Sequence, residues 1–140
     1  MGSAGTMNAE VRYAGDEIMV GLGPGSTSMV MDTKGERKSA PSPMEALLMA
    51  VAGCTMVDVV SIMEKKRQPL SEYRIEISGD RREEYPRAFT KMHLKHIVKG
   101  ENVQAEALAQ AIALSDEKYC SVAGTVRPTV EITTSFEIVQ

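Results

Sequence analysis

Two cysteines are the residues in this chain best suited to chemistry. Cys54 lies inside the apolar segment 44–63, and Cys120 follows much later in the sequence. Two cysteines are too few for a secreted disulfide framework, and their separation does not match a CxxC redox or zinc motif. A cysteine thiolate is both a nucleophile and a metal ligand. The pattern alone leaves open whether these are two free thiols or one functional pair.

Two further polar residues follow Cys54 in the same segment. If residues 44–63 form a helix, the rotation of about 100° per residue places Cys54, Asp58 and Ser61 along one stripe. A thiol, a carboxylate and a hydroxyl then face the same side, so this stripe is the first candidate site. The alternative is structural: Cys54 acts as a small buried apolar residue, and Asp58 is held by a backbone or arginine partner in the core.

Cys120 has a different setting, just before the segment "SVAGTV" that can form a helical turn or two. A thiol at a helix N-terminus meets unpaired N–H groups, which we expect to lower its pKa. The two histidines offer little to a metal, because His93 and His96 lie three residues apart on a predicted strand and therefore on opposite faces. We expect no metal site and no cofactor.

The elements that position these residues begin with strands. Alternating apolar and polar residues around a Gly-Asp turn predict a hairpin over residues 8–22 and a third strand over 28–32. Ser42, Pro43 and Glu45 have the pattern of an N-cap, a proline at the first helical position and a capping-box acid. The long helix should therefore begin at Ser42 and run to about Arg67.

The second half contains strands and helices in a different order. Alternation over 72–82 and 89–100 predicts an antiparallel pair of strands. A helix capped by Asn102 should end near Lys118, and a final strand should follow Pro128. Strands and helices do not alternate regularly, which favours the α+β class over a parallel doubly wound sheet.

Length and composition limit the remaining classes. The 140 residues are suited to a single domain spanning 1–140, in which residues 1–6 look like an appended remnant before Met7. The net charge is −3 and both signs are interleaved, so no nucleic-acid partner is expected. The start lacks the pattern of a secretory signal, so we expect a cytoplasmic protein. The apolar run 46–63 is short for a membrane span and contains Asp58, so we expect no membrane partner.

Two motifs together point to a known family. The stretch "SPMEALLMAVAGCTMVDVVSIM", followed by "EKYCSVAGTV" and a closing strand, resembles the OsmC/Ohr family of osmotically inducible and organic hydroperoxide resistance proteins. The similarity is greatest to the less characterised OsmC-like branch. The resemblance implies an OsmC-like fold, with antiparallel sheets around a long buried central helix, in an intertwined homodimer.

The resemblance also implies roles for both thiols. Cys54 would be the peroxidatic cysteine that attacks an organic hydroperoxide, Cys120 would resolve the sulfenic acid as a disulfide, and a dithiol reductant would restore the pair. The expected function is thus a thiol-dependent peroxidase, a cysteine-based hydroperoxide reductase that acts in oxidative stress. The alternatives are a non-enzymatic module on the same fold, either redox-responsive or binding a small apolar ligand, and a purely structural dimer module.

The sequence departs from the family pattern beside the reactive cysteine. Well-known members carry a glutamate directly after the proline that starts the long helix, where it orients an arginine against the thiolate. Met44 occupies that position here, and Glu45 is one residue out of register. Arg37 is the candidate arginine from the preceding loop, whereas Arg12 lies on a predicted strand. Only the two cysteines are carried over as site residues.

Overall fold

A computed structural model describes residues 4–140 of the chain as a mixed α+β protein, which confirms the predicted class. The chain divides into two compact units between Leu47 and Leu48. The prediction of one domain over residues 1–140 stays a prediction, and residues 1–3 lie outside the described part. In order, the elements are β1 (Glu10–Gly15), β2 (Ile18–Leu22), β3 (Ser28–Asp32), α1 (Pro43–Lys65), β4 (Glu72–Arg81), β5 (Phe89–Lys99), α2 (Ala105–Leu114), the π-helical turn η1 (Ser115–Tyr119), α3 (Ser121–Val126) and β6 (Glu131–Ile138).

The first unit is an antiparallel meander in the order β1-β2-β3. Its hairpin turn is made by Asp16 and Glu17, both with positive φ, preceded by Gly15 at φ 91°. Two successive residues at positive φ are what a tight hairpin turn requires, because that twist matches the flanking strands. The predicted hairpin and third strand are confirmed.

A buried carboxylate fixes the loop that follows β3. The Asp32 side chain is fully covered and accepts two bonds from the Arg37 guanidinium, Nε to Oδ2 at 2.8 Å and Nη2 to Oδ1 at 2.9 Å. Arg37 also reaches Asp16 in the hairpin turn at 2.7 Å. Hydrogen bonding from Arg37, followed by that from Ser39, holds the pKa of Asp32 well below its usual range. Arg37 thus ties the loop to the hairpin.

Helix α1 begins as the sequence predicts. The backbone N–H of Ser42 donates to Glu45 Oε1 at 3.0 Å, and the N–H of Glu45 donates to Ser42 Oγ at 3.2 Å, which is a reciprocal capping box. These bonds to Ser42 lower the pKa of Glu45. The helix ends at Lys65, two residues before the predicted limit at Arg67.

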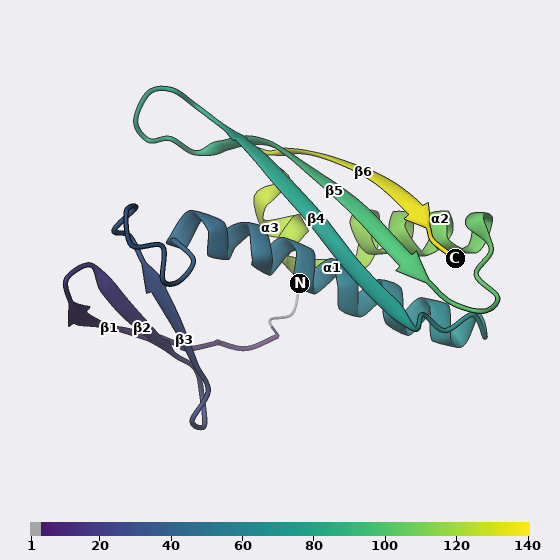
Figure 1. Cartoon of the computed structure of the whole chain (residues 1–140), viewed down its shortest axis with the longest axis horizontal. Coiled ribbons are helices and arrows are strands. Elements are labelled where there is room, and N and C mark those ends of the chain that lie inside the picture. Colours follow the sequence, from purple (N-terminus) through teal and green to yellow (C-terminus); the bar gives the residue numbers. More distant parts are fainter. Residues whose placement is uncertain (1–3) are drawn as a thin grey trace. The chain divides into compact units, whose positions relative to one another are not determined.

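The second unit packs a three-stranded sheet, in the order β4-β5-β6, against helices α1 and α2 (Figure 1). The pairing of β4 with β5 is antiparallel, as predicted. The pairing of β5 with β6 is parallel, so the expectation of purely antiparallel sheets is wrong for this strand. The reason is the long connection through α2, η1 and α3, which returns the chain to the starting end of β5 before β6 begins.

The core of the second unit lies where α1, β5 and α2 meet. Its buried members are Val59, Met63, Val98, Leu108, Ala111 and Ile112. Within a single chain, α1 is buried along one face only, and Val57 on the same helix is 69% exposed. By length and composition alone α1 could cross a membrane, a test that core helices of soluble proteins also pass. The single chain therefore leaves part of an apolar helix uncovered.

The segment after β5 differs from the prediction at both ends. Gln104, not Asn102, is the N-cap of α2, and the α-helix ends at Leu114 instead of near Lys118. The wider turn η1 follows and closes with the Cys120 N–H donating to the Ser115 carbonyl at 2.8 Å. Single-turn π-helical segments are often found at functional sites.

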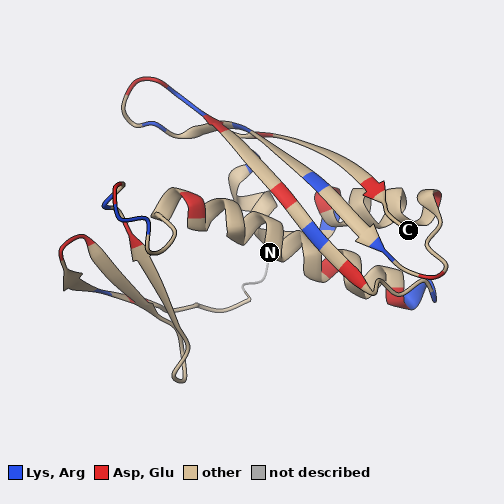
Figure 2. Ribbon diagram, viewed as in Figure 1, with Lys and Arg blue, Asp and Glu red and all other residues tan. Residues whose placement is uncertain are grey.

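Charges of both signs are distributed along the strands of the second sheet (Figure 2). Lys91 pairs with Glu131 and Lys95 with Glu137 across β5 and β6. These exposed pairs are each worth about 0–1 kcal/mol, so they help strand register more than stability. The two signs balance locally, and the sheet surface does not carry a field of one sign.

Candidate functional site

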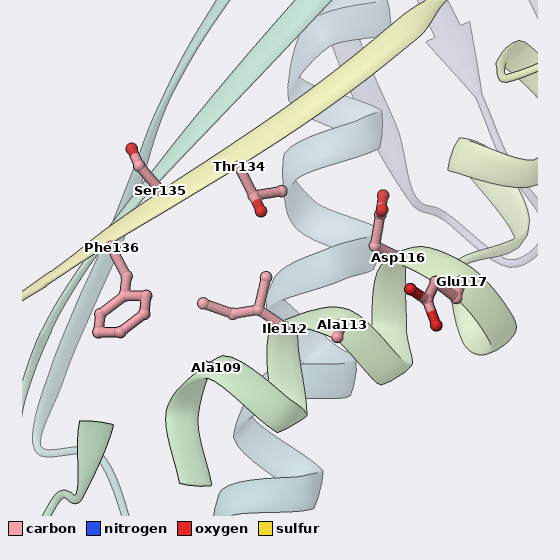
Figure 3. Close-up of a pocket in the computed structure, with 8 residues that line it drawn as sticks. All are labelled: Ala109, Ile112, Ala113, Asp116, Glu117, Thr134, Ser135 and Phe136. Carbon is pink, nitrogen blue, oxygen red and sulfur yellow. The ribbon is translucent and has the colours of Figure 1, made fainter. Parts of the chain in front are cut away.

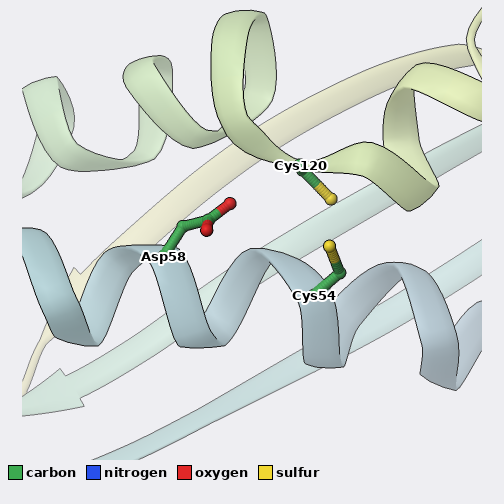
Figure 4. Close-up of side chains that lie close together, drawn as sticks. All are labelled: Cys54, Asp58 and Cys120. Atoms are coloured by element: carbon green, nitrogen blue, oxygen red, sulfur yellow. The ribbon is translucent and has the colours of Figure 1, made fainter. Parts of the chain in front are cut away.

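The structure brings three of the predicted residues together. Sγ of Cys54, a carboxylate oxygen of Asp58 and Sγ of Cys120 all lie within 4.8 Å of one another. Figure 4 shows the two thiols pointing toward each other, with the Asp58 carboxylate beside them. Cys54 and Asp58 are one turn apart on α1, as the helical stripe predicted, and Cys120 comes from the junction of η1 and α3. We call these three residues the thiol cluster.

Cys120 is the buried member of the cluster, with 5% of its surface exposed. As the N-cap of α3 its Sγ accepts the Ala123 N–H at 3.4 Å, and the Thr55 hydroxyl donates to it at 3.5 Å. Both donors favour the thiolate. Burial nevertheless outweighs them and raises the pKa of Cys120. The prediction that its helix position lowers this pKa is therefore wrong, because α3 is short and the thiol is desolvated.

Cys54 is the more accessible thiol. It is half-buried, reduced and located in the middle of α1, where the helix supports it on both sides. Its sulfur lies within 4.8 Å of the Cys120 sulfur, whereas a disulfide needs about 2.05 Å, so the two thiols are neighbours that are not bonded. The residue next along the helix, Thr55, is the one that donates to Cys120.

Asp58 has a hydroxyl partner in place of the expected backbone group or arginine. Ser115 Oγ donates to Asp58 Oδ2 at 2.8 Å. Among residues 4–140, the ion pairs of the structure all involve other carboxylates. One oxygen of Asp58 is thus fixed by Ser115, and its negative charge is left beside two thiols.

A pocket of about 390 Å³ opens beside the thiol cluster. Its lining combines apolar and polar side chains: Asp58, Ser61, Ile62, Lys65, Leu114 and Tyr119. Ser61 belongs to this lining, so it lies on the predicted stripe without joining the cluster itself. Neither cysteine belongs to this lining, so the pocket meets the thiol cluster only through Asp58. A second pocket of about 360 Å³ lies between α2, η1 and β6, and its lining contains no member of the cluster (Figure 3). The pocket with access to Asp58 is the one relevant to the thiols.

The histidines take no part in the cluster. His93 bonds to Thr133 at 2.6 Å and Ser135 at 2.9 Å on the more open side of the sheet. His96 is fully buried, and its Nδ1 lies 2.6 Å from the Tyr73 hydroxyl. Burial lowers the pKa of His96 to about 4. The opposite-face prediction is correct. Among residues 4–140, the atoms close enough to hold a metal jointly belong to Cys54, Asp58 and Cys120, a set that the expectation of no metal site did not consider.

Two residues of the site were missed at the level of sequence. Neither Ser115, which donates to Asp58, nor Thr55, which donates to Cys120, was singled out from the sequence. Each is a fully covered polar residue among apolar neighbours, with exposures of 0% and 4%. A serine or threonine on an otherwise apolar helical face is the signal that points to a specific hydrogen-bond partner.

The residues considered as activators of Cys54 have other partners. Glu45 is committed to the capping box with Ser42. Arg37 is held by Asp32 and Asp16, and Arg12 is paired with Glu10. Each of these contacts lies within residues 4–47, where it has a structural purpose of its own.

Comparison with known proteins confirms the fold and the family that the sequence resemblance predicted. A family model described as OsmC-like protein matches residues 34–135. Protein YhfA of Escherichia coli (strain K12) is 42% identical over 133 residues, which cover 95% of this chain and 98% of that protein.

Two solved structures illustrate the range of the fold. A hypothetical protein from Aquifex aeolicus VF5 is 30% identical, with a TM-score of 0.86 over 96% of this chain and 97% of that one. The organic hydroperoxide resistance protein OhrB of Bacillus subtilis is 13% identical, with a TM-score of 0.65 over 96% of this chain and 100% of that one. The second likeness is one of fold alone.

Proposed function

Since this chain belongs to the OsmC-like protein family, we propose that it is a thiol-dependent peroxidase that reduces organic hydroperoxides. The single observation that carries the proposal is the approach of the two sulfurs to within 4.8 Å. The likeness in fold to a protein named for organic hydroperoxide resistance adds support. A disulfide between these sulfurs would be the natural end of one catalytic cycle.

In the proposed first step, the Cys54 thiolate attacks the terminal oxygen of the hydroperoxide, the one that carries the hydrogen. The O–O bond breaks, the oxygen that is attacked stays on sulfur as a sulfenic acid, and the alkoxide takes a proton and leaves as an alcohol. The pocket beside Asp58 supplies apolar walls, from Ile62 and Leu114, for the organic part of such a substrate.

In the proposed second step, Cys120 sulfur attacks the sulfenic sulfur of Cys54. The S–O bond breaks, and hydroxide leaves as water after taking a proton. Cys120 must lose its own proton first, and burial makes that loss unfavourable. We assign this proton to Asp58, whose carboxylate lies within 4.8 Å of Cys120 Sγ and is held by Ser115; a side-chain rotation or one bridging water completes the transfer. A dithiol reductant then supplies two electrons and two protons that return both cysteines to thiols.

The proposal includes a homodimer in the cytoplasm. The uncovered apolar face of α1, with Val57 69% and Met49 55% exposed, supports a second copy as its cover. Two cysteines without a disulfide framework are compatible with a reducing compartment. Light scattering of the purified chain should give a dimer mass, and a monomer at micromolar concentration would contradict this part.

Peroxide consumption tests the activity. The reduced chain should consume cumene hydroperoxide with a dithiol as reductant. Cys54→Ser should abolish turnover, because the attacking thiol is lost and the remaining thiol, Cys120, is buried with a raised pKa. Cys120→Ser should still lose one thiol to one equivalent of peroxide but should form no intramolecular disulfide. Failure to consume any organic hydroperoxide with either a simple dithiol or a lipoyl reductant would refute the proposal.

A further inference from the structure

The thiol cluster has a second chemical capacity that does not depend on peroxide. We propose that the reduced chain binds one zinc-class divalent cation through Cys54 Sγ, Asp58 and Cys120 Sγ, with the fourth position open to the adjoining pocket. Zinc sites with three protein ligands and one exchangeable position are an established type. The inference rests on the geometry of reduced residues and stands whether or not the chain is a peroxidase.

The spacing of the ligand atoms fits this coordination. All three lie within 4.8 Å of one another before any ion is bound. Around tetrahedral zinc, with Zn–S near 2.3 Å and Zn–O near 2.0–2.2 Å, ligand atoms are about 3.5–3.8 Å apart. The cluster therefore needs to contract by about 1 Å, which small rotations of the Cys54 and Asp58 side chains can supply.

The donor types select the kind of cation. Two thiolates favour zinc and other soft or borderline ions over magnesium and calcium, which prefer all-oxygen sites. The carboxylate completes a set with enough negative charge to bind a divalent ion. As the ion binds, the thiols release their protons to solvent, so the cost of a buried thiolate at Cys120 is offset by the metal.

Outer hydrogen bonds already orient two of the three ligands. Ser115 donates to one oxygen of Asp58, which leaves the other oxygen for the ion. The Thr55 hydroxyl and the Ala123 N–H both donate to Cys120 Sγ. Such partners fix ligand orientation in metal sites and typically change affinity about 10–100-fold when removed. The polar support of this cluster is therefore what a metal site requires.

Metal binding and the disulfide exclude each other, because the disulfide removes both thiolate ligands. The bound ion would protect Cys54 from oxidation, and oxidation of the pair would release the ion. The cluster would thus couple the zinc content of the chain to its redox state.

The test uses the reduced full-length chain without peroxide, titrated with zinc alone against a chromophoric chelator. We expect one zinc per chain and none on chain oxidised to the disulfide with diamide. Asp58→Asn should weaken binding at least about tenfold, since it removes a ligand charge. The matched control is Glu64→Gln, which neutralises an exposed carboxylate on the same helix and should leave affinity unchanged. Cobalt in place of zinc should give thiolate-to-metal absorption that Cys54→Ser and Cys120→Ser each reduce.

Three results would overturn the proposal: zinc retained by a chain with both cysteines replaced by serine, equal affinity of the oxidised and reduced chains, or equal affinity of Asp58→Asn and Glu64→Gln. Circular dichroism of each variant identifies any loss of fold, and the oxidised wild-type chain provides a comparison that needs no substitution. Because no peroxide is present, failure here leaves the peroxidase proposal intact, and failure of peroxide turnover leaves this one intact.

Discussion

Asp32 and Asp58 are two carboxylates that each accept a hydrogen bond from a serine, and they differ in everything else nearby. Asp32 receives Ser39, two bonds from Arg37 and the Lys34 backbone N–H. Asp58 receives Ser115 and otherwise has two thiols as its close polar neighbours. One carboxylate has its charge matched by a guanidinium, and the other does not.

The difference separates a structural carboxylate from a chemically available one. Both oxygens of Asp32 accept charge-assisted hydrogen bonds. The charge of Asp32 therefore stabilises Arg37, which holds the loop to the hairpin. Asp58 keeps an oxygen and a charge directed at groups that can lose protons or bind metal. The sequence reflects part of this difference, because Lys34 and Arg37 follow Asp32 closely whereas the immediate neighbours of Asp58 are apolar on both sides.

The largest effect on the resolving step should come from Asp58→Asn. We expect disulfide formation after one equivalent of hydroperoxide to slow by about 100-fold, because an amide cannot accept the proton of Cys120. The first oxidation of Cys54 should keep its rate. Stopped-flow measurement of thiol loss, with trapping of the sulfenic acid, separates the two steps.

Glu64→Gln is the matched control for that variant and should behave as wild type in both steps. If Asp58→Asn instead slows only the first oxidation, Asp58 acts on Cys54 and the assignment of its proton to Cys120 is wrong. If Cys54 is not oxidised in the wild-type chain, the proposed peroxidase itself fails.

His96 is a third titratable group, and it differs from both aspartates because burial favours its neutral form. Burial lowers its pKa to about 4 from the ordinary 6.5. Between these values the unfolded chain binds a proton that the folded chain does not, so stability is full above pH 6.5 and falls as pH drops toward 4. The whole loss amounts to about 3 kcal/mol, at 1.36 kcal/mol per pKa unit.

Urea unfolding above and below pH 6.5 measures this loss of unfolding free energy. NMR titration of the His96 imidazole in the wild-type chain checks that this residue causes it. His93→Gln is the comparison variant and should keep the direction of the pH dependence, because burial is the largest cause of the lowered pKa of His96. A His96 resonance that titrates near its ordinary value would contradict the expectation.

Asp32→Asn should lower the thermal midpoint of the chain, because Arg37 loses the carboxylate that two of its bonds require. The lowered pKa of Asp32 means that its contribution is present above pH 3.8 and is lost as the pH falls below that value. Asp16→Asn removes an exposed partner of the same guanidinium and should have the smaller effect. Equal midpoints for the two variants, by calorimetry, would refute the distinction.

Sequence reasoning succeeded where contacts are local. The helix stripe correctly placed Asp58 beside Cys54, and the spacing of Ser42 and Glu45 correctly gave the capping box. The proximity of Cys120 to Cys54 was predicted only from the family resemblance, because their separation along the sequence does not indicate a distance in space.

The missed features depend on the path of the chain. The parallel direction of β6 follows from the route through α2 and α3, and strand patterns are the same in either direction. The raised pKa of Cys120 follows from burial by elements distant in sequence. Ser115 reaches Asp58 from a π-helical turn, where a regular helix had been predicted.

The smallest effect we predict is that of Ser115→Ala, and it tests whether Asp58 acts as a held group. Removing the hydroxyl leaves the Asp58 charge in place but frees the carboxylate to rotate, so the resolving step should slow by about tenfold, which corresponds to about 1.4 kcal/mol. Ser115→Thr retains the hydroxyl and should recover most of the rate if the added methyl is tolerated. Ser61→Ala changes a serine in the adjoining pocket and serves as the control. The same stopped-flow assay measures the rate of the resolving step in each variant. A loss of rate in Ser115→Ala as large as that in Asp58→Asn would mean that the serine itself carries the proton. No loss of rate would mean that Asp58 needs no support from η1.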